Sequence, residues 1–114
     1  TAEVTLTFDA LFSGQLLTTE TLSRMLPVGP LPGLREPPTA IDGGMGLFSN
    51  AASPYGRNYG HGGGGPGYDL TAGFYPDTPI GRLAVAVFVN TSGNERAADL
   101  EYALVGQLLG ASPS

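Results

Sequence analysis

The segment Arg82–Asn90 limits the fold of this chain more than any other feature. Its nine residues, RLAVAVFVN, are apolar except at the ends, and Val85, Val87 and Val89 are β-branched. β-Branched residues favour strands, and an uninterrupted apolar strand is typical of one that is covered on both faces. The segment therefore predicts a central β-strand, and with it a sheet to which the other elements attach.

Two further segments have weaker strand patterns. Met45–Asn50 (MGLFSN) is short and apolar, and Leu70–Tyr75 (LTAGFY) alternates enough to form a strand. Pro76–Pro79 (PDTP) is rich in turn-forming residues and predicts a strong turn after the second segment. Residues 51–57, which contain Ser53-Pro54, are expected to form a loop.

The N-terminal part of the chain has helical periodicity. Apolar residues recur at roughly helical spacing between residues 5 and 26. They are Phe8, Leu11, Phe12, Leu16, Leu22 and Met25. Gly14 interrupts the pattern, which indicates two shorter helices. Thr18 or Thr19 would cap the second helix, with the acidic Glu20 in its first turn.

A last helix is expected from about Glu95 to Leu109. Asn94 would cap it and Gly110 would end it. Its apolar stripe consists of Ala98, Tyr102, Val105, Leu108 and Leu109.

The predicted elements add up to an α+β fold. Five prolines between Pro27 and Asp42 predict an irregular connection between the first helices and the strands. We expect an antiparallel sheet of three or four strands, flanked by the N-terminal helical segment and the C-terminal helix, with both covering one face. So small a sheet has exposed edges, which invite pairing with another chain or with further sequence.

Composition excludes several kinds of chemistry. The chain has no cysteine and no lysine, and its one histidine is His61. Zinc–thiolate sites, lysine bases and multi-histidine metal sites are therefore excluded, and we expect neither a cofactor nor a metal. The net charge of -5 disfavours nucleic acid as a partner. No apolar run approaches the ~20 residues of a transmembrane segment.

The stretch Tyr59–Tyr68 (YGHGGGGPGY) is the best candidate for a functional site. Successive glycines let a ligand approach the backbone, and their amide protons can form an oxyanion hole. His61 can exchange a proton near neutral pH. The alternative is a flexible loop with a surface histidine, and the residues alone leave both open. A phosphate-binding loop is disfavoured because Pro66 intrudes and no helix start follows.

This stretch resembles the third motif of the β-lactamase-like serine hydrolases, which include class C β-lactamases, D,D-peptidases and related esterases. That motif reads Lys-Thr-Gly or His-x-Gly on a strand lining the active site, and His61-Gly62-Gly63 has the second form. The segments LFSGQLLTTETLSRML and GMGLF and the last helix also resemble the family's elements. The resemblance implies that residues 1–114 are the C-terminal portion of such a domain. It also implies an acyl-enzyme mechanism on an ester, amide or β-lactam.

Two motifs of the family are missing. Its nucleophile lies in Ser-x-x-Lys, and this chain has no lysine. Ser92-Gly93-Asn94 spells the second motif, Ser-x-Asn, but it follows the third motif instead of preceding it, so we interpret it as a turn and helix cap. The chain alone should therefore be inactive. Its expected partner is the upstream portion of the same enzyme, which could be a separate chain, and the start at Thr1 directly ahead of a helix also favours a fragment.

The resemblance implies roles for individual residues. His61 and Gly64 would be catalytic: the Gly64 amide would donate to the oxyanion, and His61 would tune the electrostatics of the site and assist proton transfer. The expected substrate is a small molecule or a peptide. The residues that would bind it are Gly62, Gly63, Tyr59 and Tyr68.

Three other functions are compatible with parts of the sequence. HGGG also forms the oxyanion hole of α/β-hydrolases, but their Gly-x-Ser-x-Gly pentapeptide is absent here. Thr1 could be an N-terminal nucleophile, although such enzymes bury that residue at a strand end and a helix is expected to follow it here. The third is a non-catalytic binding or structural module on the same scaffold, favoured if the 114 residues are a complete gene product.

Overall fold

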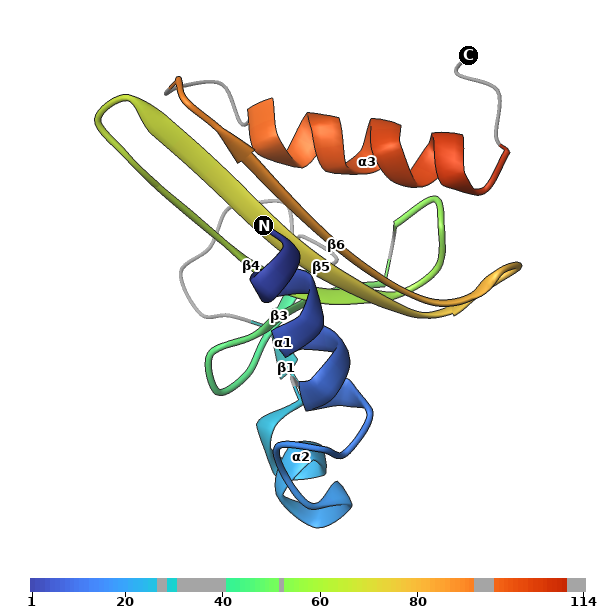
Figure 1. Ribbon diagram of the computed structural model, residues 1–114. Coiled ribbons are helices and arrows are strands. Elements are labelled where there is room, and N and C mark those ends of the chain that lie inside the picture. The colour runs from blue at the N-terminus through green and yellow to red at the C-terminus, as the bar shows by residue number, and fades with distance from the viewer. Residues whose placement is uncertain (27–28, 31–40, 52, 92–95, 111–114) are drawn as a thin grey trace.

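In the part of the chain that the computed structural model describes, three α-helices accompany a six-stranded antiparallel sheet (Figure 1). The described residues are 1–26, 29–30, 41–51, 53–91 and 96–110. The helices are α1 (Ala2–Phe12), α2 (Thr19–Met25) and α3 (Arg96–Leu108). The strands are β1 (Gly29–Pro30), β2 (Ile41–Gly43), β3 (Phe48–Asn50), β4 (Asn58–Gly65), β5 (Tyr68–Thr78) and β6 (Gly81–Val89).

The strands form a meander in which each pairs with the next, in the order β1-β2-β3-β4-β5-β6. This confirms the predicted α+β class. The sheet has more strands than the three or four expected, because β1 and β2 form in the segment predicted to be an irregular connection, which corrects that prediction at these residues. The rest of that segment, residues 27–28 and 31–40, lies outside the described residues. β3 occupies only the second half of the strand predicted at 45–50.

The break between the first two helices is confirmed. Gly14 has φ +84, a left-handed conformation that suits glycine, and it lets the chain turn after α1. Thr18 then caps α2, since its hydroxyl accepts a hydrogen bond of 3.1 Å from the Thr21 amide. None of the helices in the described residues is long and apolar enough to cross a membrane.

The last helix begins and ends close to the predicted residues. It ends at Leu108, just before Gly110 with φ +71, as predicted. The N-terminus of α3 is capped by Asp69 of β5, whose carboxylate oxygen accepts a hydrogen bond of 3.1 Å from the Ala97 amide. Asn94, the expected cap, lies outside the described residues, as does the rest of Ser92-Gly93-Asn94.

The turn predicted at Pro76–Pro79 is displaced. β5 continues through Thr78, and the turn is formed by Pro79-Ile80. A register shift between Tyr75 and Thr78 accommodates Pro76, whose backbone cannot donate to a regular ladder. The prediction was wrong because turn-forming residues also fit an irregular strand.

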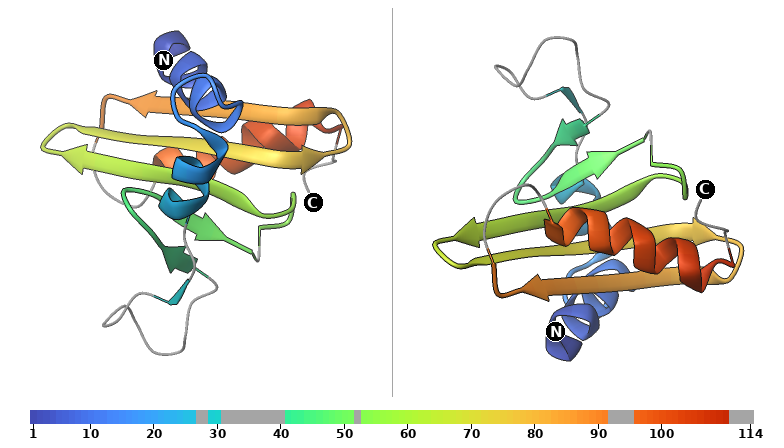
Figure 2. Two further views of the ribbon diagram at one scale, coloured as in Figure 1. Left: turned by 90° about the horizontal axis from the view of Figure 1, so that it is seen from below. Right: turned by 90° about the horizontal axis from the view of Figure 1, so that it is seen from above.

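β6 is an edge strand among the described residues, so its predicted central position is wrong. Both of its faces are nevertheless partly covered, because α1 packs on one face of β5 and β6 and α3 on the other (Figure 2), while Phe88 stays 58% exposed. Val85 of β6 is 4% exposed and packs in the core with Tyr75 and Val105. A continuous apolar run therefore indicates that helices contact both faces of the strand. It does not indicate whether the strand has one or two neighbours in the sheet.

The helices α1 and α3 lie on opposite faces of the sheet, which corrects the expectation that both cover one face (Figure 2). On the α1 face, the ring of Phe12 stacks on Phe74, with ring centroids 4.3 Å apart. On the α3 face, Tyr75 packs on Val105. Because successive strand residues point to opposite faces, Phe74 and Tyr75 give β5 a large apolar group on each side.

Candidate functional site

The glycine-rich stretch is a strand, so the alternative of a flexible loop is wrong. β4 pairs with β5 continuously from Tyr59 opposite Phe74 to Gly65 opposite Tyr68. The two residues between, Pro66 and Gly67, make the turn, and Gly67 has φ +83. Proline followed by a residue of positive φ fits a type II turn. The hairpin therefore fixes the backbone of the whole motif.

The glycines of β4 differ in what packing demands of them. A Cβ atom on Gly60 would overlap the carbonyl oxygen of Ala72, so glycine is required there. A Cβ on Gly62 would meet its nearest atom at 3.4 Å, on Gly63 at 3.7 Å and on Gly64 at 3.3 Å, none of which is an overlap. These three glycines are exposed. Packing within the described residues does not explain them, whereas a ligand that approaches the backbone would.

One edge of β4 is open beside the motif. β3 pairs with β4 only from Phe48 opposite Gly60 to Asn50 opposite Asn58. From His61 onward, the described residues provide no partner strand on that side of β4. Unpaired strand edges present amide and carbonyl groups that can bind another extended chain.

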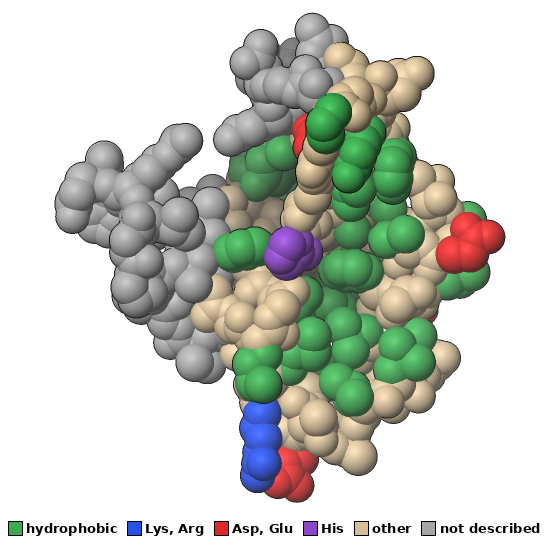
Figure 3. Space-filling model, turned by 90° about the vertical axis from the view of Figure 1, so that its left-hand side faces the viewer, with side chains coloured by type: hydrophobic (Ala, Val, Ile, Leu, Met, Phe, Trp, Pro, Cys, Tyr) green, Lys and Arg blue, Asp and Glu red, His purple; other side chains and the backbone are tan. Residues whose placement is uncertain are grey.

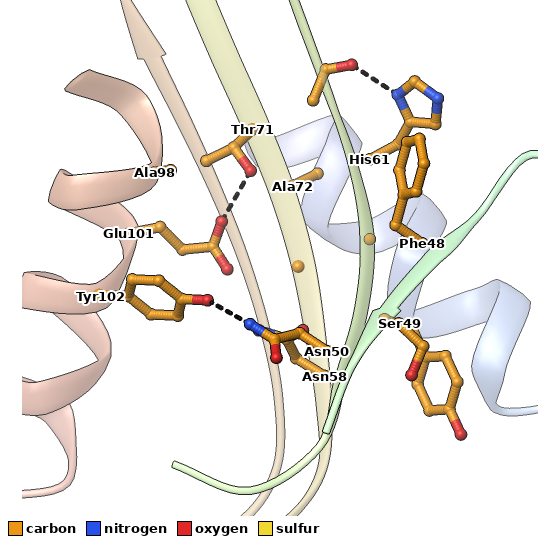
Figure 4. Close-up of a pocket in the computed structure, with 14 residues that line it drawn as sticks. Phe48, Ser49, Asn50, Asn58, His61, Thr71, Ala72, Ala98, Glu101 and Tyr102 are labelled. Carbon is orange, nitrogen blue, oxygen red and sulfur yellow. Dashed lines mark hydrogen bonds between the residues drawn. The ribbon is translucent and has the colours of Figure 1, made fainter. Parts of the chain in front are cut away.

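His61 lies on the surface next to this edge (Figure 3). Its Nδ1 lies 2.5 Å from the carbonyl oxygen of Gly62, and its ring centroid is 5.0 Å from that of Phe48 (Figure 4). Because a carbonyl can only accept, the contact requires a proton on Nδ1. The Nε2 atom of a neutral imidazole is then left as an acceptor.

The two tyrosines of the motif lie in different surroundings. Tyr59 is half-buried, with its ring centroid 5.6 Å from that of Phe12 on the α1 face. Tyr68 is 43% exposed and follows the turn, and a Cβ on Gly65 would come within 2.7 Å of its ring. Tyr59 therefore has a packing role, whereas Tyr68 is accessible from outside.

A cavity of about 190 Å³ lies behind the motif, between α3 and strands β3 to β5. Glu101 of α3 lines it, is 5% exposed, and accepts hydrogen bonds from the Thr71 hydroxyl at 2.8 Å and the Tyr75 hydroxyl at 2.7 Å. Burial, together with the hydrogen bond and the charge of Glu101, raises the pKa of Tyr75. At the other end, the Asn50 amide donates to the Tyr102 hydroxyl at 3.1 Å (Figure 4).

Sequence reasoning missed Glu101, although a signal was present. Glu101 stands within the apolar stripe of the last helix, three residues after Ala98 and four before Val105. An acidic residue on the buried stripe of a helix indicates a polar contact inside the fold.

The remaining candidate groups form no catalytic arrangement in the described residues. Ser49 is fully buried and its hydroxyl accepts a hydrogen bond of 2.6 Å from the Arg57 guanidinium, which cannot act as a base. Thr1 is exposed ahead of α1, unlike a buried N-terminal nucleophile. No group of three or more His, Asp or Glu side chains that could hold a metal ion occurs there.

Comparison with known proteins relates the fold to a hydrolase. No protein-family model and no curated protein matches the chain. The solved structure of a D-stereospecific amidohydrolase from Streptomyces sp. matches 97% of this chain with a TM-score of 0.67 and 23% sequence identity. The chain spans 30% of the length of that amidohydrolase. This chain therefore has the fold of part of a hydrolase, in agreement with the fold class predicted from the sequence.

Proposed function

We propose that this chain is the C-terminal part of a β-lactamase-like serine hydrolase, which cleaves an ester, amide or β-lactam through an acyl-enzyme. It supplies the His-x-Gly motif and the oxyanion strand, and the upstream portion of the enzyme supplies Ser-x-x-Lys. The observation that carries the proposal is the hydrolase fold over 97% of the chain, with the motif at an open strand edge. Because the structural neighbour is an amidohydrolase, an amide is the favoured substrate class.

The proposed oxyanion donor is the amide of Gly64. Negative charge develops on the carbonyl oxygen during acyl transfer, and fixed amide donors stabilise it because they need no reorganisation. Gly64 is exposed on a strand held by its hairpin partner β5, opposite Asp69. A backbone held in this way meets the requirement for a fixed donor.

The proposed substrate position is along the open edge of β4. An extended acyl group can pair there as an added strand, with Gly62 and Gly63 offering bare backbone. His61 stands at the start of this edge, and its Nε2 would accept a proton or a hydrogen bond from substrate. Tyr59 and Tyr68 are the proposed walls, of which Tyr68 is the more accessible.

The described part of this chain has an uncovered surface at the β6 edge of the sheet, on which the upstream portion would dock. β6 has no partner on its outer edge among the described residues. On α3, Leu100, Leu104 and Leu108 are 50%, 43% and 48% exposed, and their spacing of four residues places them on one flank. Tyr102 reaches Asn50 of β3 from the other flank, so the leucines lie on the β6 side. A strand paired with β6 and a helix packed on the leucines would cover both.

The oxyanion role is tested by replacing the Gly64 amide in the complete enzyme. Gly64→Pro removes the N–H, and we expect kcat for amide hydrolysis to fall by about 10²–10³, the usual effect of losing one oxyanion donor. Gly64→Ala keeps the N–H and is the matched control, with kcat within about threefold of the wild type. Melting temperatures of both variants exclude unfolding. Equal activity in the two variants would contradict the role.

A further inference from the structure

The cavity beneath α3 is lined by Glu101 and also by His61 and Gly62 of the motif, so it adjoins the open edge of β4. Glu101 and His61 lie on opposite sides of β4 (Figure 4). Gly60, Gly62 and Gly73 are among the residues that line the cavity. At about 30 Å³ per water in the liquid, its volume of about 190 Å³ holds a ligand of a few heavy atoms.

The lining of this cavity is rich in acceptors. Each carboxylate oxygen of Glu101 accepts one hydrogen bond, from Thr71 or Tyr75, which leaves about half of its acceptor positions unused. The hydroxyl of Tyr102 accepts from Asn50 and adds a further oxygen.

The negative charge of Glu101 has no cationic partner among the described residues. The chain has no lysine. Arg24 pairs with Glu20 and Arg82 with Asp9, both at the surface. Buried charges are normally paired, because neutral hydrogen bonds only partly offset the loss of hydration. A cation of suitable size would therefore complete this site.

We propose that the cavity binds a small ligand with a primary ammonium group, and that Glu101 is the residue that holds the ammonium. An ammonium has three donors, which suit the free acceptor positions of the carboxylate and the nearby hydroxyl oxygens. A single carboxylate with hydroxyl neighbours favours such a group over a divalent metal ion, which takes several charged ligands. The proposal is independent of the proposed hydrolase activity.

Titration of the 114-residue chain with methylammonium chloride, followed by ¹H–¹⁵N NMR, tests the site. We expect saturable shifts at the Thr71, Gly73 and Glu101 amides, and none when sodium chloride is added at the same ionic strength. Shifts that do not saturate, or that sodium chloride reproduces, would overturn the proposal.

Two substitutions and a control make the test specific. Glu101→Gln keeps the shape and removes the charge, and should weaken methylammonium binding at least tenfold. Ala98→Leu fills the cavity from α3 without altering Glu101, and should abolish binding even if Glu101→Gln fails to fold. Asp99→Asn changes an exposed acid on the same helix and should leave binding unchanged. Unchanged affinity in the Ala98→Leu variant, or in a folded Glu101→Gln variant, contradicts the site.

Discussion

At the scale of single residues, Gly60 and Gly73 are two positions of the sheet where neighbouring atoms leave no room for a side chain. A Cβ on Gly60 would overlap the Ala72 carbonyl, and a Cβ on Gly73 would overlap the carboxylate of Glu101. Gly60 and Gly73 are paired across β4 and β5. The strand that carries the motif, β4, therefore lies very close to β5 at the place where Glu101 of α3 contacts the sheet.

Alanine at Gly60 should destabilise the chain, whereas alanine at Gly63 should not. The methyl group at Gly60 forces the backbone apart, and overpacking of this kind costs about 1–3 kcal/mol. At Gly63 the nearest atom would be 3.7 Å away, so the free energy of unfolding should change by no more than about 0.5 kcal/mol. Urea unfolding followed by circular dichroism measures both, and equal losses would show that the close approach at Gly60 is not real.

Tyr75 should make stability fall at alkaline pH. Its pKa is raised above the ordinary value of 10.0, mainly by burial. Above that pH the unfolded chain loses the phenol proton that the folded chain keeps, so the unfolded state binds fewer protons and the free energy of unfolding falls as pH rises. Tyr75→Phe should show a shallower fall in urea unfolding between about pH 9 and pH 11. Parallel curves for the two proteins would contradict this assignment.

At the scale of elements, the sequence predicted the helix boundaries, because these depend on residues close together in the chain. Gly14 and Thr18 indicated the break between α1 and α2, and Gly110 indicated the end of α3. The edge position of β6 and the opposite faces of α1 and α3 could not be predicted, because they depend on contacts between distant segments. Glu101 was missed for the same reason, since its partners Thr71 and Tyr75 are 30 and 26 residues away.

The resemblance of HGGGGPGY to a known motif, and not its hydrophobic periodicity or charge, indicated the candidate site. HGGGGPGY alone was equally compatible with a loop, and only the hairpin with β5 shows that it is a strand. The roles of His61 and Gly64 stay predictions, because the nucleophile that they would serve belongs to the proposed upstream portion.

The start of α3 should depend on a residue of β5. Asp69 accepts a hydrogen bond from the Ala97 amide, as a capping carboxylate does at a helix N-terminus. Asp69→Ala should lower the free energy of unfolding by about 1 kcal/mol, the usual cost of losing a cap. Asp77→Ala, at an exposed position of the same strand, is the control and should have little effect. A loss at Asp77 as large as at Asp69 would point to strand propensity instead.

At the scale of the whole molecule, the chain resembles one part of a larger enzyme. It spans 30% of the length of the amidohydrolase that it matches. The outer edge of β6 and the leucine flank of α3 lie open in the described structure, and the proposed upstream portion would cover them. Alone, the 114-residue chain should self-associate through this surface. The substitution Leu104→Lys should shift the oligomer distribution, measured by analytical ultracentrifugation, toward the monomer. An unchanged distribution would contradict self-association through the leucine flank.

Activity labelling of the native polypeptide tests the proposed hydrolase most directly. Antibodies against this chain would capture it from its source together with any bound partner. Fluorescent fluorophosphonate and β-lactam probes would then be added, and intact masses measured under denaturing conditions. We predict label on a polypeptide that carries Ser-x-x-Lys, either a longer chain containing this sequence or a second chain captured with it. A single unlabelled polypeptide of 114 residues would contradict the hydrolase and favour a non-catalytic module.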